Sequence, residues 1–243
     1  MRLPDDAFNA VLDRLRGHSV GLAVNEFGNF GDHLIQRGTV ELLARNGIRC
    51  RVITRKETLA GNWPTDVSII AESGGGNLGT REGLGSPRRR ARLSKLRGPK
   101  IVLPQSASDM GEDLSAFETV FVREETTWEL LHKTHPDIRL APDLALALEL
   151  PPSRPTHQRG TFLRCDMERT TDAGRDPVFE VKSADEYIAL AGSYRQIVTN
   201  RLHFAIASLL QEQSAVLKAN SYHKNRSMFT TWLRYFPRAE WSE

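Results

Sequence analysis

Residues 20–46 read VGLAVNEFGNFGDHLIQRGTVELLARN, and they combine two patterns from which a fold class follows. The apolar run Val20–Val24 predicts a buried strand. A glycine-rich turn comes next, and from Asp32 to Asn46 apolar residues recur at helical spacing, with Gly47 where a helix-ending glycine belongs. A strand joined by a short turn to a helix is the repeating unit of α/β folds.

The same alternation continues on either side of this stretch. Further strands are predicted at residues 51–54, 67–71, 101–103, 119–122, 138–140, 161–164, 196–199 and 215–217. Helices are predicted at residues 183–191 and 202–211. Strands that alternate with helices predict an α/β protein with a parallel sheet, and right-handed crossovers make a doubly wound, Rossmann-like layer the expected form.

A proline-rich segment divides the chain. Residues 150–155 read LPPSRP, which is typical of a linker. We therefore expect a Rossmann-like domain at residues 1–150 and a smaller one, also Rossmann-like, at residues 156–243.

Composition excludes several classes of protein. The 243 residues are 40% hydrophobic, which fits a globular chain rather than a disordered one. No apolar run approaches the ~18 residues of a membrane span, and the N-terminus lacks the apolar run of a signal peptide. Two cysteines give no disulfide framework, so a cytoplasmic location is expected. A net charge of +3 argues against a dedicated nucleic-acid binder.

The first candidate site is the loop at residues 27–33, FGNFGDH, between a strand and a helix. Gly28 and Gly31 allow the backbone to turn tightly, and the start of the helix offers free N–H groups to an anion. Asp32 has two interpretations that stay open, as the N-cap of the helix or as a functional carboxylate.

The second candidate is the loop at residues 72–79, ESGGGNLG, which follows an apolar strand. Three consecutive glycines cost much chain entropy, which favours a backbone nest for phosphate or carboxylate over a simple turn. The loop matches neither the Walker A motif nor the dinucleotide fingerprint.

The third candidate is Arg201 with His203, at a junction of strand and helix. Carboxyl ends of parallel strands are where open α/β sheets bind ligands. An arginine there can pair bidentately with phosphate or carboxylate, and a histidine titrates near neutral pH. Arg123 and Asp143 follow two other predicted strands, with an ordinary surface ion pair as the alternative interpretation of each, and neither residue alone predicts a site.

Two other features carry less information. Residues 88–100, RRRARLSKLRGPK, predict a solvated helix face, with attraction of anionic lipid headgroups or diphosphate carriers as the alternative. They contain no aromatic residue on which bases could stack. His132 and His135 have no further ligand at metal-site spacing, so no metal is expected.

Taken together, these motifs resemble the polysaccharide pyruvyl transferase family. The matching pieces occur in the family's order from residue 20 to about residue 230 and cover nearly the whole chain. They are Gly28–Asp32, Gly74–Asn77, Leu103–Ser106, Val122–Glu124, Ala141–Asp143, Phe162–Arg164, Arg201–His203 and Asn220–Asn225.

The resemblance implies a fold and an activity. The fold would be two Rossmann-like lobes facing across a cleft, as in B-type glycosyltransferases, with a small C-terminal lobe. The activity would be transfer of pyruvate from phosphoenolpyruvate onto a sugar of a surface polysaccharide or its precursor, which forms a cyclic ketal. Phosphoenolpyruvate would be a co-substrate, and no cofactor would be needed.

The resemblance also implies roles for individual residues. His203 and Asp32 would be the catalytic pair, with the general acid not assigned between them. Donor and phosphate binding would fall to Arg201, Arg123, Gly75, Gly76, Asn77, Asn29 and Gly31. Acceptor-binding or auxiliary roles would fall to Asn220, Ser221, Tyr222, Lys224 and Asn225.

The chain departs from the family pattern at three points. Asn200 precedes Arg201 where members often have Asp, and His223 stands where many have Gly. The C-terminal half is also short, so that part of the acceptor surface is either missing or supplied by a second subunit.

Several alternatives stay open at this stage. The acceptor would be a glycan or a lipid-linked saccharide, and contact with the inner face of the membrane or formation of a homo-oligomer is compatible with the sequence. A nucleotide-sugar glycosyltransferase of the same fold would use the same loops for a diphosphate. A non-catalytic family member is the other alternative, although Asp32, Arg123, Arg201 and His203 are all retained.

Overall fold

The computed structural model describes residues 3–25, 28–80, 85–166, 168–170 and 174–243. The chain divides into two compact units. The N-terminal unit comprises Pro4–Phe27 and Ile35–Leu144, and the C-terminal unit comprises Met1–Leu3, Gly28–Leu34 and Ala145–Glu243.

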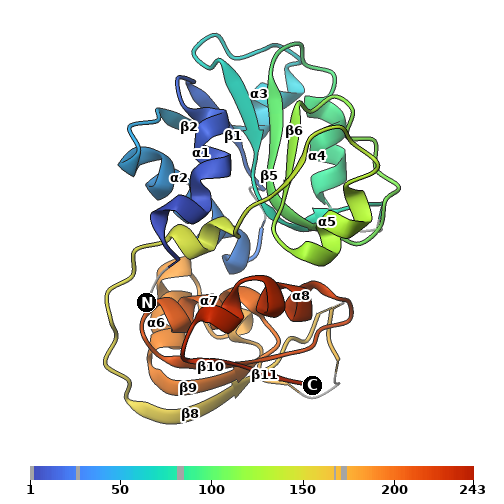
Figure 1. The fold of residues 1–243 in the computed structure, drawn as a ribbon. Helices are drawn as coiled ribbons and strands as arrows, with labels where there is room; N and C mark the ends of the chain where they lie inside the picture. Colours follow the sequence, from blue (N-terminus) through green and yellow to red (C-terminus); the bar gives the residue numbers. More distant parts are fainter. Residues whose placement is uncertain (1–2, 26–27, 81–84, 167, 171–173) are drawn as a thin grey trace. The chain divides into compact units, whose positions relative to one another are not determined.

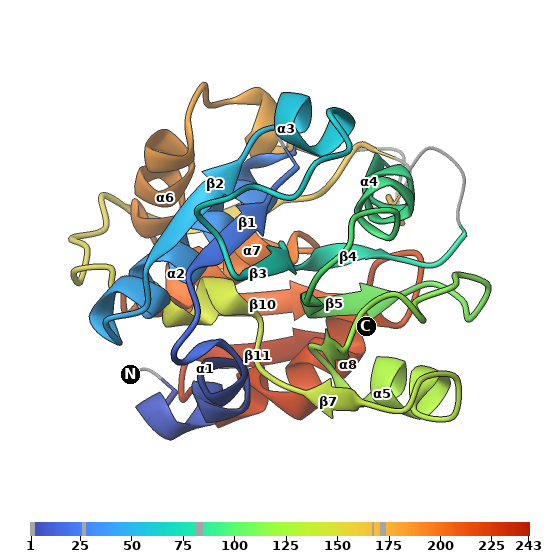
Figure 2. The ribbon, with the colours of Figure 1, turned by 90° about the horizontal axis from the view of Figure 1, so that it is seen from above.

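A parallel sheet forms the centre of the N-terminal unit. Its strands are β1 (Val20–Ala23), β2 (Cys50–Ile53), β3 (Ile69–Glu72), β4 (Gly75–Leu78), β5 (Lys100–Ala107), β6 (Thr119–Val122) and β7 (Ile138–Leu140). The main order is β2-β1-β3-β5-β6-β7, and β4 pairs with β5 off this path. Figure 2 shows β2, β1 and β3 side by side and β4 beside β5. The order reverses at β1, as in doubly wound folds.

Helices lie on both faces of this sheet. They are α1 (Asn9–Leu15), α2 (Phe30–Arg45), α3 (Arg55–Leu59), α4 (Gly85–Leu93) and α5 (Glu125–Leu131), after a short 3-10 turn η1 (Asp5–Phe8). Helices α1 and α2 lie on one face, and α4 and α5 lie on the other (Figure 1). The strands β1, β3, β5 and β6 are buried along their whole length, as expected of a sheet covered on both sides.

A second parallel sheet forms the C-terminal unit. Its strands β8 (His157–Phe162), β9 (Tyr194–Thr199), β10 (Ser214–Lys218) and β11 (Ala239–Ser242) lie in the order β11-β10-β9-β8. Helices α6 (Ala184–Gly192), α7 (Leu202–Leu210) and α8 (Lys224–Thr231) cover one face (Figure 1). Short 3-10 turns η2 (Leu144–Ala147), η3 (Pro177–Phe179) and η4 (Leu233–Tyr235) complete the chain. The alternating burial of β10 is typical of a sheet packed on one side.

The predicted α/β class with parallel sheets is confirmed. The predicted strand at residues 161–164 is misplaced, because β8 ends at Phe162. There the backbone N–H of Leu163 bonds to the carbonyl of Arg175, and that of Arg164 bonds to the side chain of Asn200. The domain boundary at residues 151–155, the cleft between two lobes and the likeness to B-type glycosyltransferases stay predictions.

No described helix has both the length and the apolar character that crossing a membrane requires.

Candidate functional site

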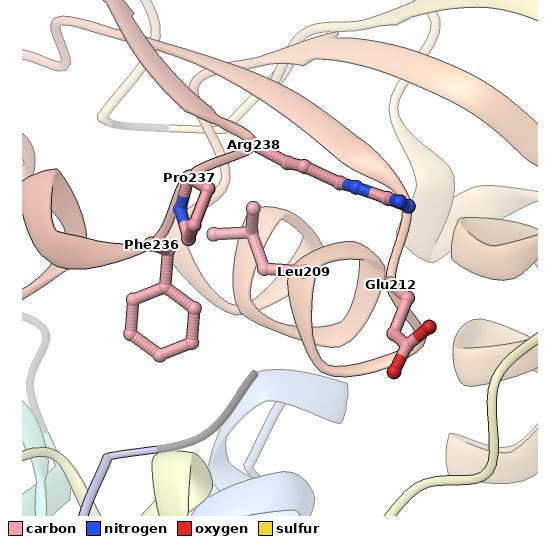
Figure 3. Close-up of a pocket in the computed structure, with 5 residues that line it drawn as sticks. All are labelled: Leu209, Glu212, Phe236, Pro237 and Arg238. Atoms are coloured by element: carbon pink, nitrogen blue, oxygen red, sulfur yellow. The ribbon is translucent and has the colours of Figure 1, made fainter.

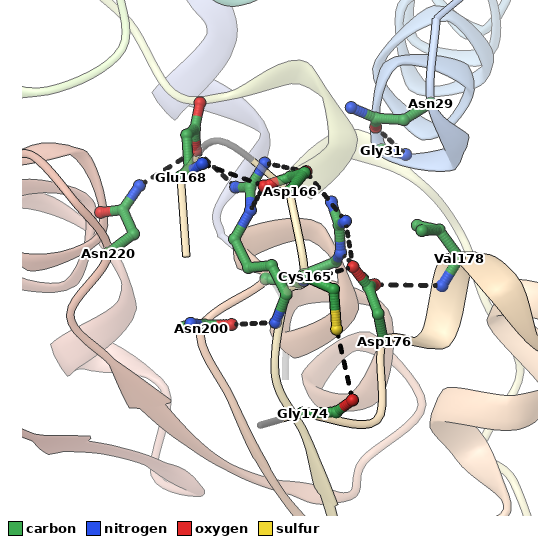
Figure 4. A network of polar contacts seen from close by, with 12 residues as sticks. Asn29, Gly31, Cys165, Asp166, Glu168, Gly174, Asp176, Val178, Asn200 and Asn220 are labelled. Carbon is green, nitrogen blue, oxygen red and sulfur yellow. Dashed lines mark hydrogen bonds and ion pairs between the residues drawn. The ribbon is translucent and has the colours of Figure 1, made fainter. Parts of the chain in front are cut away.

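Arg201 stands at the carboxyl end of β9, directly before α7. The backbone N–H of Arg201 bonds to Oγ1 of Thr199, the last residue of the strand. Its guanidinium forms a bidentate pair with Asp176, with Nε–Oδ1 at 2.5 Å and Nη2–Oδ2 at 2.6 Å. Nη2 also lies 3.0 Å from Oδ2 of Asp166 (Figure 4). Arg201 is 5% exposed, and these ion pairs hold it in a fixed orientation at the edge of the sheet.

The loop after β8 extends this ion pair into a chain of alternating charges. Arg164 pairs with Asp166 through Nε and Nη2, both at 2.8 Å, and also with Glu168. Glu168 in turn accepts from Nζ of Lys224 at 2.5 Å. Three cations and three carboxylates thus alternate from Lys224 to Asp176, so the charges of the cluster balance.

These contacts shift the pKa values of the carboxyl groups. Burial of Glu168 by itself raises its pKa, but Lys224 and Arg164 outweigh that effect and lower the pKa to about 2. Burial also acts to raise the pKa of Asp166, and Arg164 together with Arg201 brings it well below its usual range. Both carboxyl groups are therefore ionised at neutral pH, and both balance the arginines.

The motif at residues 220–225 supports this loop. Asn220 donates from Nδ2 to Glu168 at 3.2 Å, next to the contact from Lys224. Asn225 donates from Nδ2 to the carbonyl of Asn200 at 2.7 Å and to that of Lys218 at 2.9 Å.

The other two residues of this motif with an expected acceptor role are more accessible to solvent. Ser221 is exposed, and the ring of Tyr222 lies 5.0 Å from Nζ of Lys224. The acceptor roles expected of Asn220, Ser221, Tyr222, Lys224 and Asn225 stay predictions, and the structure shows three of these residues bracing the loop and strand ends.

Asn200 explains one departure from the family pattern. Its Oδ1 accepts from the backbone N–H of Arg164 at 2.7 Å. An aspartate could accept the same bond, so the position keeps its contact with the loop without adding a fourth carboxylate to the cluster.

Asn29 and Asp32 cap the start of α2 with reciprocal hydrogen bonds between side chain and backbone. Oδ1 of Asn29 accepts from the N–H of Gly31 at 2.8 Å and from that of Asp32 at 3.3 Å. Oδ2 of Asp32 accepts from the N–H of Asn29 at 3.1 Å. This is the geometry of a capping box, with Asn29 as N-cap. The interpretation of Asp32 as the N-cap is therefore wrong, and Asp32 is the carboxylate partner of that cap.

Gly31 lets a histidine approach this helix start. A Cβ at Gly31 would lie 2.4 Å from Nδ1 of His203 and 2.9 Å from Oδ1 of Asn29. Every residue of α7 except His203 is buried. The structure thus brings together Asn29, Gly31, Asp32 and His203, four residues that the sequence analysis singled out.

Tyr187 is a neighbour that the sequence analysis missed. It is 1% exposed, and its ring lies 4.9 Å from that of Phe204 and 5.7 Å from that of Phe30. Burial raises the pKa of Tyr187, so the phenol stays protonated at neutral pH. Arg201 lies close enough to affect its titration.

The remaining predicted donor residues lie in the N-terminal unit. Arg123, at the end of β6, is 1% exposed. It donates from Nε to Ser106 at 2.8 Å and pairs through Nη1 with Asp143 at 2.7 Å. Because Asp143 is also buried, the pair is no surface ion pair. The donor role of Arg123 stays a prediction.

Two of the three glycines form a strand rather than the expected loop. Gly75 and Gly76 belong to β4, which pairs with β5, and the side chain of Asn77 lies outside the described part. A Cβ at Gly74 would lie 2.6 Å from the carbonyl oxygen of Pro104, which accounts for one glycine by close backbone approach. Phosphate binding by Gly75, Gly76 and Asn77 stays a prediction.

The basic stretch is also less solvated than expected. Arg89 and Arg90 are buried and both pair with Glu72, and Arg90 also pairs with Glu112 at 2.6 Å. The expectation of a solvated helix face is wrong for these two residues, because buried carboxylates compensate their charge.

A pocket of about 340 Å³ lies elsewhere in the C-terminal unit (Figure 3). Its lining comprises Leu209, Glu212, Phe236, Pro237 and Arg238. Leu209 is at the far end of α7 from Arg201, about 12 Å along the helix. None of the predicted site residues lines this pocket, so we do not include it in the candidate site.

Comparisons with known proteins identify the family. The model of the family "Polysaccharide pyruvyl transferase" matches residues 29–222, which is most of the chain. The chain belongs to the polysaccharide pyruvyl transferase family. Its membership makes it a relative of transferases that act on polysaccharides, as the sequence resemblance predicted.

Two proteins of Bacillus subtilis (strain 168) are similar over much of their length. "Putative pyruvyl transferase EpsO" is 27% identical, and the alignment covers 87% of this chain and 84% of that protein. "General stress protein 30" is 25% identical, with 68% of this chain and 61% of that protein covered.

One solved structure shares the fold. A functionally uncharacterized protein of Klebsiella pneumoniae subsp. pneumoniae NTUH-K2044, KP1_0663, superposes with a TM-score of 0.73 over the whole of both chains, at 21% sequence identity.

Proposed function

We propose that this family member transfers pyruvate from phosphoenolpyruvate to a glycan and forms a cyclic ketal. The observation that carries the proposal is the position of Arg201, a buried arginine fixed at the carboxyl end of β9, directly before the helix that also presents His203. The carboxyl ends of parallel strands are where α/β sheets bind their ligands.

The charge of the donor matches these residues. Phosphoenolpyruvate carries a carboxylate and a phosphate, about three negative charges in all. The planar N–H donors of a guanidinium group match the oxygens of both in bidentate pairs. In the proposal Arg201 binds one of these anionic groups, while Asn29 and Gly31 position the start of α2 beside His203. Arg123, Gly75, Gly76 and Asn77 are further donor contacts in the proposal.

The chemistry needs one acid and one base. In the proposal His203 protonates the methylene carbon of the donor, which leaves an oxocarbenium-like centre at C2. A sugar hydroxyl attacks C2 and gives its proton to Asp32. The C2–O bond to phosphate then breaks with its electron pair leaving on phosphate, which takes the proton from Asp32. A second hydroxyl then closes the ketal and gives its proton to His203, which restores the acid.

The setting of the reaction is also part of the proposal. We place it in the cytoplasm, where phosphoenolpyruvate is available, with a free or lipid-linked saccharide as acceptor. Contact with a membrane surface and formation of a homo-oligomer are compatible with this setting.

The decisive experiment is chemical analysis of the surface polysaccharide. We expect cells from which the gene is deleted to lose a pyruvate ketal from the repeating unit, as measured by mass spectrometry. A wild-type copy should restore the ketal and an Arg201→Lys copy should not. Unchanged ketal content in the deletion strain contradicts the proposal.

A further inference from the structure

Among the described residues, the guanidinium of Arg201 is held mainly along the edge formed by Nε and Nη2. Nε and Nη2 form the bidentate pair with Asp176, at 2.5 and 2.6 Å. Nη1 donates no hydrogen bond to any described residue. The arginine therefore has an inner edge that is fully engaged and an outer side that still has donors for a ligand.

Asp176 is itself fixed independently of Arg201. Its Oδ2 accepts from the backbone N–H of Cys165 at 2.9 Å, and its Oδ1 accepts from that of Val178 at 3.3 Å, where it caps η3. The Asp176 side chain is fully buried. Hydrogen bonds from the backbone of Cys165 and Val178 thus hold the Asp176 carboxylate (Figure 4), and the inner edge of Arg201 meets it there.

Asp166 contacts the same arginine in a different way. Its side chain is 39% exposed, and it is engaged bidentately by Arg164. It takes only one N–H of Arg201, at 3.0 Å. An arriving anion can replace this single contact without leaving a buried charge unpaired, because Arg164 continues to balance Asp166.

We propose that Asp176 is a positioning residue for the donor, holding the inner edge of Arg201 so that its outer side faces the anionic group, and that Asp166 is the exchangeable partner. The inference rests on the proposed function, since it assumes that Arg201 binds the donor. Two carboxylates on one arginine thereby have opposite effects on ligand binding.

The test is calorimetric titration of the purified full chain with phosphoenolpyruvate. Asp176→Asn should raise the Kd by about 10- to 100-fold, the range of one charge-assisted contact. Asp166→Asn should leave the Kd unchanged or lower it. Glu180→Gln is the matched control, because it removes a surface carboxylate from Arg175 in the same unit and should leave the Kd unchanged.

Melting temperatures separate positioning from folding. If the role of Asp176 is only structural, Asp176→Asn lowers the melting temperature and the fraction of molecules able to bind phosphoenolpyruvate but leaves the Kd unchanged. That result overturns the inference. If Asp176→Asn does not fold, Asp176→Glu decides, because it keeps the charge but displaces the guanidinium. An unchanged Kd in that variant, or an equal increase in Asp166→Asn, contradicts the inference.

The proposed function fails by a different result. If wild-type protein does not bind phosphoenolpyruvate, or Arg201→Lys binds it as tightly as wild type, the donor site itself is misassigned. If wild type binds and Arg201→Lys does not, but Asp176→Asn binds normally, only the positioning role is wrong.

Discussion

Gly31 is the residue through which two distant motifs meet. The histidine at the start of α7 occupies the space that a side chain at Gly31 would need, with Nδ1 2.4 Å from the position of a Cβ. The same Cβ would also crowd the capping side chain of Asn29. The glycine is explained by close approach and requires no unusual backbone angle.

We expect Gly31→Ala to reduce turnover by about 10²-fold, since a displacement of about 1 Å at a reacting group has that effect. The measurement is a double-mutant cycle with His203→Ala. The loss from Gly31→Ala should nearly vanish when His203 is already absent. An undiminished loss in that background shows that Gly31 acts through another residue.

His203→Ala should lower turnover by about 10²–10⁴-fold, the usual cost of removing a general acid or base. Binding of phosphoenolpyruvate should stay nearly intact, and one limb of the pH–rate profile should disappear. If the variant instead loses donor binding and keeps the shape of the profile, His203 is a phosphate ligand and the acid is to be sought at Asp32.

The sequence identified the residues of the candidate site better than it identified their contacts. Asn29, Gly31, Asp32 and His203 stand in recognisable motifs, and the structure brings them together. The carboxylates that balance Arg201 carry no such signal. Asp176 lies 25 residues before Arg201 in an irregular segment, and only the fold shows that the two pair.

At the scale of elements, the loop after β8 is tied to α8 by charge. Lys224, the first residue of α8, and Asn220 both contact Glu168. Because Arg164 contacts Glu168 from the other side, this one carboxylate joins the loop to the helix.

We expect Glu168→Gln to destabilise the protein at pH 7 by on the order of 1–3 kcal/mol, the cost of unpairing buried charges. The pKa of Glu168 falls from 4.5 to about 2 on folding, so its stabilisation is fully present above pH 4.5 and is lost as the pH falls towards 2. Urea unfolding of both proteins across this range is the measurement. A difference in unfolding free energy that persists at pH 2 contradicts this assignment.

We expect Asn29→Ala to cost about 1 kcal/mol of stability, since it removes the cap that satisfies the N–H groups of Gly31 and Asp32. Asn29→Ser should restore most of it, because serine caps helices equally well. Thermal unfolding of the three proteins checks this, and an Asn29→Ala variant as stable as wild type shows that the cap contributes nothing.

Periodicity predicted most of the strands and the helices α2, α6 and α7, and it left several short elements unpredicted, among them α1, α5 and β11. The strands β6 and β7 have the predicted bounds, and β1, β2, β5, β9 and β10 begin or end within a few residues of them. Half of the strand β4 is glycine, which carries no strand signal, and the strand forms because it pairs with β5. The burial of Arg90 likewise depends on carboxylates that a local pattern cannot show.

At the scale of the whole molecule, the two units have unequal sheets. The N-terminal sheet is seven-stranded and the C-terminal sheet is four-stranded, and both are wholly parallel. The residues that approach one another around α7 all belong to the C-terminal unit, including the short piece Gly28–Leu34 that comes from the N-terminal half of the sequence. This unit therefore contains both the proposed acid and the proposed base.

Calorimetry with phosphoenolpyruvate tests the central claim most directly, with nucleotide sugars titrated in parallel. We expect wild type to bind phosphoenolpyruvate and Arg201→Lys to lose about 1.5–3 kcal/mol of binding free energy, because lysine keeps the charge but not the fork. Arg175→Lys, at an exposed arginine of the same unit, should bind like wild type. Binding of a nucleotide sugar in place of phosphoenolpyruvate, or equal affinity of wild type and Arg201→Lys, would contradict the account.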